Sequence, residues 1–385
     1  MVSLLADLVY EGARSITGPL LASLGSSATL VGVVTGAGEA AALVLRLFFG
    51  TWADRTGSHW RLTFIGYGLT AVSVPLLAVT PFVGTAGLTV ACLLILAERT
   101  GKAARSPSKS ALLAVAASGV GRGRGFGAHK ALDQVGAFAG PLVVAGAIAF
   151  TARIWPAMAV LAIPGAVAVV LLVVVRAHLP AAAASANPSL RSGGWIAQNM
   201  GRGLPPSFFL FAASAGASTA GLVSYGLIGF HLVADGIVSS ETVPLIYSLG
   251  MAAAAVAALV VGWAYDRRGA RILVALPFLV SIVPALVFSS ALWAALVGVT
   301  IWGFAARLQD STVKALVADL VSSGRLAGAY GVFAAIQGSA ALGGGAAAGY
   351  LYPRSLPLLV VLVIAAQAVA LILLIVTLRR SHLRT

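Results

Sequence analysis

Two short stretches decide the fold: Gly50-Thr-Trp-Ala-Asp54-Arg55-Thr-Gly57 and Gly262-Trp-Ala-Tyr-Asp266-Arg267-Arg-Gly269. Each follows a long run of apolar residues, and the two share Gly, Asp, Arg and Gly at identical spacing. Four identities in this register are difficult to ascribe to chance. The repeat indicates that the chain consists of two related halves.

A second repeat supports the duplication. The stretch Lys109-Ser-Ala-Leu-Leu-Ala114 aligns with Val313-Lys-Ala-Leu-Val-Ala318, and the same register places Gly127 on Gly331 and Gly140 on Gly344. Parallel repeats of this kind are typical of transporters in which two bundles rock about a central site.

The composition places both halves in lipid. Of 385 residues, 59% are hydrophobic and 9% are charged, and the mean hydropathy is +0.99. A helix needs roughly 20 apolar residues to cross the hydrocarbon core. We therefore expect an all-α polytopic membrane protein with twelve transmembrane helices in two pseudo-symmetric six-helix bundles. The expected spans are 2–24, 28–53, 60–80, 84–105, 122–150, 154–176, 206–234, 241–265, 271–290, 292–316, 324–349 and 353–378.

The net charge of +14 is interpreted as a topology signal and not as a nucleic-acid surface. Basic residues gather where even-numbered spans end, which by the positive-inside rule puts both termini in the cytoplasm. The cations counted in this way include Arg99, Lys102 and Arg105 at the end of span four. The Pro-, Gly- and Ala-rich interval 177–205 is predicted to be a cytoplasmic linker between bundles 1–176 and 206–385.

The G-x-x-x-D-R-x-G stretch at 50–57, with Arg61 beyond it and a copy at 262–269, resembles the hallmark loop of the major facilitator superfamily. The stretches 98–107 and 129–133 look like a bacterial subgroup of that superfamily whose substrates are undefined. The resemblance implies a secondary transporter of a small molecule in the bacterial inner membrane.

The loop motif also has a physical interpretation. Gly50 and Gly57 permit close approach and a tight turn, and Asp54 can accept hydrogen bonds from a helix N-terminus or a neighbouring Arg. We predict gating latches, and the members of the two motifs are Gly50, Asp54, Arg55, Gly57, Arg61, Gly262, Asp266, Arg267 and Gly269. The alternative is that these charges are merely interfacial.

Ionisable residues inside the predicted helices are candidates for function. Each costs roughly 2.5 to 3.5 kcal/mol to insert at a helix centre. Asp7, Glu11 and Arg14 span about 60° around the helix axis and so share one face, which must line a cavity or a helix interface. Glu39 and Arg46 repeat this logic on the second span.

The fifth span carries His129, Lys130 and Asp133. A carboxylate whose partner changes between two conformations can load and release a proton. The candidates for proton coupling or for the cavity wall are Asp7, Glu11, Arg14, Glu39, Arg46, Lys130 and Asp133. Static ion pairs between helices remain the alternative.

Transport direction is predicted from Gly127, Gly136, Gly140 and Pro141, which resemble the antiporter motif of the superfamily. Small residues at four-residue spacing also serve generic helix packing. The prediction is proton-coupled efflux, with proton-coupled import or uniport as the alternative and a non-transporting sensor or lipid-handling scaffold less favoured. The expected partners are a small-molecule substrate, protons and the lipid bilayer, with no nucleic acid, and the chain is expected to be a monomer.

No enzyme motif is present: H-E-x-x-H, G-x-S-x-G and a P-loop are all missing from the sequence. The lone Cys92 rules out a disulfide framework and a cysteine metal site. We therefore expect no enzymatic activity, no cofactor and no metal.

Overall fold

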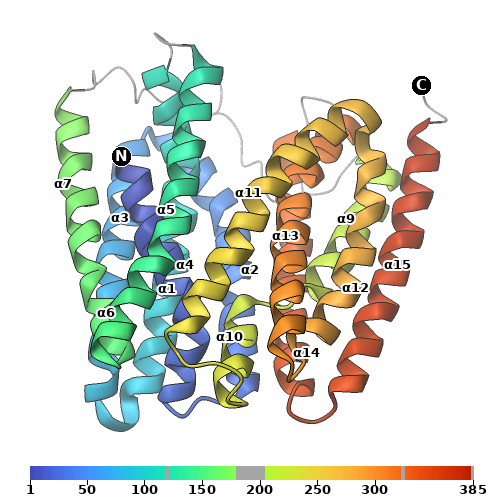
Figure 1. Cartoon of the computed structure of the whole chain (residues 1–385). Helices are drawn as coiled ribbons and strands as arrows, with labels where there is room; N and C mark the ends of the chain where they lie inside the picture. Colours follow the sequence, from blue (N-terminus) through green and yellow to red (C-terminus); the bar gives the residue numbers. More distant parts are fainter. Residues whose placement is uncertain (118–120, 179–203, 322–325, 383–385) are drawn as a thin grey trace. The chain divides into compact units, whose positions relative to one another are not determined.

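A computed structural model describes residues 1–117, 121–178, 204–321 and 326–382. Over these residues the secondary structure is helical and contains no strand (Figure 1). The elements of the first half are α1 (Val2–Ser23), α2 (Ala28–Thr56), α3 (His59–Leu76), η1 (Leu77–Phe82), η2 (Gly84–Ala86), α4 (Gly87–Ala116), α5 (Arg122–Thr151), α6 (Ile154–Val160) and α7 (Ala162–His178). Those of the second half are α9 (Pro206–Gly221), α10 (Tyr225–Ala234), α11 (Thr242–Arg268), η6 (Gly269–Val274), α12 (Ala275–Val287), α13 (Leu292–Leu320), α14 (Leu326–Leu351) and α15 (Leu356–His382).

The expected all-α fold is confirmed. Several short elements join end to end, such as α3 with η1, α6 with α7 and α9 with α10, and the described residues then form twelve segments of membrane length. The main difference from the expected spans is in the fourth segment. α4 runs to Ala116, which is beyond the predicted end at residue 105. Of the predicted linker, the structure describes only residues 177, 178, 204 and 205.

Length and apolarity alone select nine candidate spans among the described residues, and one of them, Thr242–Val287, has 46 residues and is long enough for two crossings. α1 and α4 are not among the nine. Both carry too many charged side chains: Asp7, Glu11 and Arg14 in α1, and five charged residues from Glu98 to Lys109 in α4. The charged side chains inside α1 and α4 therefore explain why apolarity does not select these two helices as spans.

The chain divides into two compact units. Over its described residues, the first lies within Met1–Ser26, Ala41–Gly193 and Ser239–Ser248, and the second within Ser27–Ala40, Gly194–Val238 and Leu249–Thr385. α2 and α11 each contribute one part to each unit. The two halves of the chain thus exchange short helical segments.

Within each unit the helices pack in the same pairs. In the first unit α1 packs on α5 and α3 packs on α4; in the second, α9 packs on α14 and α12 on α13. Counted by membrane crossing, these are segments one with five and three with four, then seven with eleven and nine with ten. The duplication predicted from the sequence therefore extends to tertiary packing.

Apolar side chains on the outer helix faces agree with a lipid environment. Phe150, Leu259 and Trp293 are strongly exposed, as are Ile163 and Phe82. Exposed aromatic and aliphatic side chains at this density mark a membrane interaction surface in a protein of this composition.

Candidate functional site

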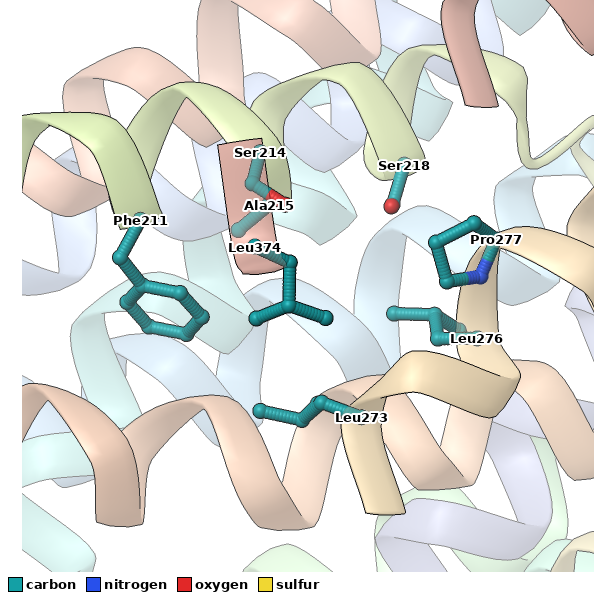
Figure 2. A pocket seen from close by; sticks show the side chains of 8 residues that line it. All are labelled: Phe211, Ser214, Ala215, Ser218, Leu273, Leu276, Pro277 and Leu374. Atoms are coloured by element: carbon teal, nitrogen blue, oxygen red, sulfur yellow. The ribbon is translucent and has the colours of Figure 1, made fainter. Parts of the chain in front are cut away.

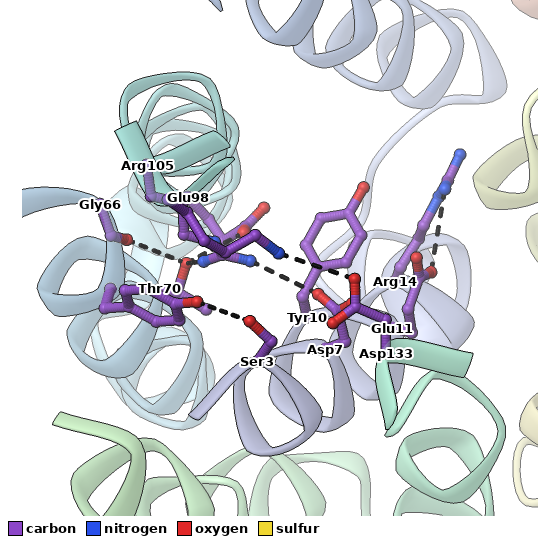
Figure 3. A network of polar contacts seen from close by, with 12 residues as sticks. Ser3, Asp7, Tyr10, Glu11, Arg14, Gly66, Thr70, Glu98, Arg105 and Asp133 are labelled. Atoms are coloured by element: carbon purple, nitrogen blue, oxygen red, sulfur yellow. Dashed lines mark hydrogen bonds and ion pairs between the residues drawn. The ribbon is translucent and has the colours of Figure 1, made fainter. Parts of the chain in front are cut away.

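The charged face predicted for α1 lies inside the first unit. Asp7, Glu11 and Arg14 are each partly buried, and Figure 3 shows them among side chains from α3, α4 and α5. α1 packs on α5, α7 and α3, so this face meets protein. The expectation that these charges avoid lipid is therefore met by the geometry, because a helix interface surrounds them.

Arg105 of α4 is the centre of the first cluster. Its Nη2 lies 3.8 Å from Oδ1 of Asp7, and its Nη1 donates to the hydroxyl of Thr70. That hydroxyl in turn donates to Oε1 of Glu98 over 3.2 Å. One guanidinium thus joins Asp7 directly and Glu98 through a hydroxyl. Arg105 is 3% exposed and Glu98 is 6% exposed, so this part of the chain of contacts is buried, whereas Asp7 is partly exposed.

The second cluster consists of contacts made by Tyr10 and Glu11. Arg99 donates to the hydroxyl of Tyr10, and the ammonium of Lys102 lies 3.4 Å from the centroid of the Tyr10 ring. Glu11 Oε2 lies 3.8 Å from Nη1 of Arg14. The same oxygen accepts a hydrogen bond of 2.5 Å from Tyr247, which belongs to the α11 segment included in the first unit.

Asp133 of α5 forms the third cluster. Its carboxylate lies 3.6 Å from Nζ of Lys109, 3.6 Å from Nε2 of His129 and 4.0 Å from Nζ of Lys130. Asp133 is buried, whereas the side chain of Lys130 is 63% exposed. The predicted neighbours His129 and Lys130 are therefore present, and Lys109 of α4 adds a second helix to the cluster.

Two of the cations singled out in the sequence lie beside carboxylates of the network: Arg14 beside Glu11 and Lys130 beside Asp133. Asp7 pairs instead with Arg105 of α4. Glu39 and Arg46 lie in parts of α2 that belong to different units. Asp7 and Arg105 are brought together by the packing of helices that lie far apart in sequence. The charge pattern of a single helix does not reveal such a pairing.

Sequence reasoning also missed the role of α4. Arg99 and Arg105 counted as cations at a membrane exit, and both are buried against residues of α1 and α3. A signal was available: Glu98, Lys102, Arg105 and Lys109 follow a spacing of four, three and four residues. At about 100° per residue this places all four on one helix face.

The glycines of the antiporter-like motif pack α5 against α1. A Cβ on Gly136 would lie 2.2 Å from the carbonyl oxygen of Leu4, and one on Gly140 would lie 2.2 Å from that of Leu8. Gly127, by contrast, faces open space, and Pro141 lies within a continuous helix. In the second unit Gly344, the repeat partner of Gly140, meets the carbonyl of Ala220 on α9 in the same way.

The two loop motifs adopt matching turns. Gly57 and Gly269 have φ angles of 66° and 58°, which favour glycine because a Cβ is strained there. Asp54 Oδ1 lies 3.6 Å from Nε2 of His59, the first residue of α3. A Cβ on Gly50 would lie 3.3 Å from the Pro107 side chain on α4, whereas one on its repeat partner Gly262 would face open space.

Arg55 and Arg61 lie on either side of this turn, and Arg61 is exposed. In the second motif Asp266 and Arg267 are both exposed, and the Arg267 guanidinium lies 4.1 Å from the centroid of the Trp263 ring. The turn geometry expected from the glycines is thus present in both copies, and only the first copy places its Asp beside a residue of the following helix.

The second unit has an uncharged polar cluster where the first has charges. Gln309 and Gln337 both donate to the hydroxyl of Thr219, over 2.5 Å and 3.2 Å. The repeat register that places Gly344 on Gly140 also places Gln309 on Arg105 and Gln337 on Asp133. The duplicated positions therefore hold a guanidinium and a carboxylate in one unit and two amides in the other.

Figure 2 shows a narrow pocket in the same unit. It is lined by Phe211, Ser214, Ala215, Ser218, Leu273, Leu276, Pro277 and Leu374. Its volume is about 10 Å³, which is room for about one water molecule. This pocket is too small to hold a substrate.

No protein-family profile matches the chain. Uncharacterised proteins from Mycobacterium tuberculosis and Mycobacterium bovis are each 48% identical to it over 375 residues, which cover 97% of this chain and 90% of each relative. The chain belongs to the same family as these mycobacterial proteins. The match extends over nearly the full length of both, so both units are included.

Solved structures show which fold this family has. The nucleoside transporter NupG matches with a TM-score of 0.78 at 15% identity, over 98% of this chain and 97% of that chain. The peptide transporter POT in complex with alafosfalin matches with a TM-score of 0.76 at 16% identity, over 99% and 94%. A bacterial homolog of the human lysosomal transporter Spinster gives 0.63 at 15% identity, over 99% and 95%.

These likenesses show that the chain has the major facilitator fold. Two of the three structures are named transporters, and the third is a homolog of one. The nine apolar spans place it in a membrane as a multi-pass protein.

Proposed function

We propose that the chain is a secondary transporter that moves a small molecule by alternating access, with proton-coupled efflux as its mode. The observation that carries the proposal is the buried charged network of α1, α4 and α5 in a major facilitator fold. Buried ionisable groups inside a membrane protein are costly, and they mark substrate or proton pathways. The names of the fold's neighbours, a nucleoside and a peptide transporter, support a small solute as substrate.

Arg105 supplies a physical route for proton coupling. Its guanidinium contacts Asp7 at one end and the hydroxyl of Thr70, beside Glu98, at the other. When Asp7 takes up a proton, its attraction for Arg105 falls, and the guanidinium can turn fully towards Glu98. If Asp7 bound a proton on one side of the membrane and released it on the other, the partner of Arg105 would alternate between Asp7 and Glu98. Glu11 and Asp133 remain candidates, because each is paired with cations in the same unit.

Efflux is favoured by the antiporter-like glycines on α5, although their packing on α1 explains the spacing equally well. Proton-coupled import or uniport is the second candidate, because the same fold serves both directions. Uptake that persists without a proton gradient would favour uniport.

The test uses the full chain in proteoliposomes loaded with a defined mixture of benzoate, succinate, glucose 6-phosphate, adenosine and choline. An inward proton gradient is imposed, and the retained compounds are measured by mass spectrometry. We expect at least one compound to leave faster than from protein-free vesicles, and only while the gradient lasts. If none does, secondary efflux is wrong.

Variants then locate the coupling group. Asp7→Asn, Glu11→Gln, Glu98→Gln and Asp133→Asn are compared with Asp310→Asn, an exposed acid of the second unit. Neutralising the coupling acid should abolish gradient-driven flux and leave exchange of labelled for unlabelled compound intact. A purely structural ion pair behaves differently, because removing one partner leaves an uncompensated buried charge and lowers stability by about 3 to 5 kcal/mol. Full gradient-driven flux in all four variants would exclude coupling at this network.

A further inference from the structure

The three helices of the charged network carry more cations than carboxylates. Among the side chains that the structure describes in α1, α4 and α5 there are four carboxylates and six Lys or Arg side chains. The carboxylates are Asp7, Glu11, Glu98 and Asp133, and the cations are Arg14, Arg99, Lys102, Arg105, Lys109 and Lys130. The excess of two positive charges remains even with every acid ionised and His129 neutral.

Each carboxylate already has a cation within reach. Asp7 has Arg105 at 3.8 Å, Glu11 has Arg14 at 3.8 Å, Glu98 has Arg99 at 4.0 Å and Asp133 has Lys109 at 3.6 Å. Of the two remaining cations, Lys130 is mostly exposed and is solvated outside the network. The other is Lys102, and it lies within the network.

Lys102 is partly buried, and its ammonium lies over the ring of Tyr10 at 3.4 Å from the centroid. Among the described residues no carboxylate lies within 4.0 Å of it, which sets Lys102 apart from its neighbours on α4. Arg99 approaches the same ring at 4.8 Å. The charge of Glu11 attracts the Lys102 ammonium, whereas Arg99 and Arg14 repel it. A cation–π contact compensates only part of the cost of a desolvated ammonium.

The nearest acid in this cluster is committed elsewhere. Glu11 Oε2 contacts Arg14 and accepts from Tyr247, so its charge is shared with a guanidinium and a hydroxyl. The cluster at Tyr10 and Glu11 therefore holds three cations, Arg14, Arg99 and Lys102, and the single carboxylate Glu11, with Glu98 reaching Arg99 at 4.0 Å. Such a surplus of fixed positive charge and hydrogen-bond donors is complementary to an added anion.

We propose that Lys102, with Arg14 and Arg99 beside it, forms a subsite for the carboxylate or phosphate group of a small organic anion, and that this anion is the transported substrate. The inference rests on the proposed transport function. The Tyr10 ring holds the Lys102 ammonium in place by a cation–π contact. The bound anion supplies the negative charge that the network lacks.

Binding is tested with the purified full chain in detergent. Melting temperature is measured against concentration for benzoate, succinate and glucose 6-phosphate as anions, and for adenosine and choline as uncharged and cationic probes, since a ligand stabilises the state that binds it. At least one organic anion should raise the melting temperature, and adenosine and choline should not. Lys102→Gln should weaken that anion at least tenfold, and Lys102→Arg should keep its affinity within about threefold.

Arg153→Gln serves as the matched control, because Arg153 is an exposed cation at the start of α6, outside the network. It should leave the anion's affinity unchanged. Arg14→Gln is a second variant that should weaken the same anion, and it keeps the test decisive if Lys102→Gln does not fold.

Two further arms identify the source of the anion. If chloride and sulfate raise the melting temperature as much as the organic anions do, the site binds inorganic ions only. Stabilisation by phosphatidylglycerol but not phosphatidylcholine vesicles, lost in Lys102→Gln, would show a lipid headgroup. Either result overturns the substrate assignment.

Equal transport of adenosine or choline by the unaltered chain and by Lys102→Gln would overturn the subsite and leave transport standing. If no probe moves at all, the transport function fails, and the binding measurement still decides the subsite.

Discussion

The contact between α1 and α5 gives the sharpest stability prediction. In Gly136→Ala the new Cβ would lie 2.2 Å from the carbonyl oxygen of Leu4, and in Gly140→Ala it would lie 2.2 Å from that of Leu8. Ordinary contact begins at 3.4 Å, so the helices must separate by about 1 Å. The atoms in contact are backbone and cannot turn away. Overpacking of this kind costs about 1 to 3 kcal/mol of unfolding free energy.

The same helix offers matched controls. Gly127 and Gly146 face open space, so Gly127→Ala and Gly146→Ala add a methyl group without a clash. Each control should gain up to about 1 kcal/mol, because alanine is the better helix former. Because the helix-propensity gain is common to all four substitutions, the two classes of variant should differ by the overpacking cost, about 1 to 3 kcal/mol.

The assay is reversible unfolding of each purified variant in mixed micelles, followed by far-UV circular dichroism. Gradient-driven flux is measured on the same preparations. If the motif glycines act only in packing, total flux should follow the folded fraction, and flux per folded molecule should stay unchanged. Equal stability of all four variants would refute the argument from backbone contact.

Three further predictions concern other parts of the chain. Asp54→Asn removes the carboxylate beside His59 and should shift the population towards the inward-open state without unfolding the protein; unchanged distances between spin labels across the cytoplasmic face would count against a latch. Tyr247→Phe removes a hydrogen bond to the ionised Glu11 and should lower the unfolding free energy by about 1.5 to 3 kcal/mol, measured by the same micelle titration. A cysteine placed at Ser58 in a Cys92→Ser background should react only with a cytoplasmic reagent, and labelling from outside would contradict the proposed orientation.

The sequence was sufficient for those features that depend on local pattern. The spans other than α1 and α4 follow from apolar runs, and the duplicated Asp54 and Asp266 turns follow from glycine spacing. The cluster at Asp133 was also predictable in part, since His129 and Lys130 lie one helical turn away on the same helix.

The contacts of Asp7 and Glu11 with other helices could not be predicted in this way. Arg105 and Tyr247 reach them from helices that lie far away in the chain, and the choice of neighbour depends on how those helices pack. A positive residue near a predicted membrane exit has two physical explanations, an interfacial anchor and a buried partner. The sequence indicated the first for Arg99 and Arg105, and their burial adds the second.

The charge of α1 and α4 has a consequence for how the chain enters the membrane. Neither helix is apolar enough to be selected as a span by itself, yet α1 emerges from the ribosome well before α4. Until Arg105 and Lys102 arrive, Asp7 and Glu11 have only Arg14 within their own helix to offset their insertion cost. α1 should therefore remain at the translocon, or at its lipid boundary, until roughly the first 110 residues have been synthesised. Membrane insertion of α1 would then be coupled to the arrival of α4, before the rest of the first unit is assembled.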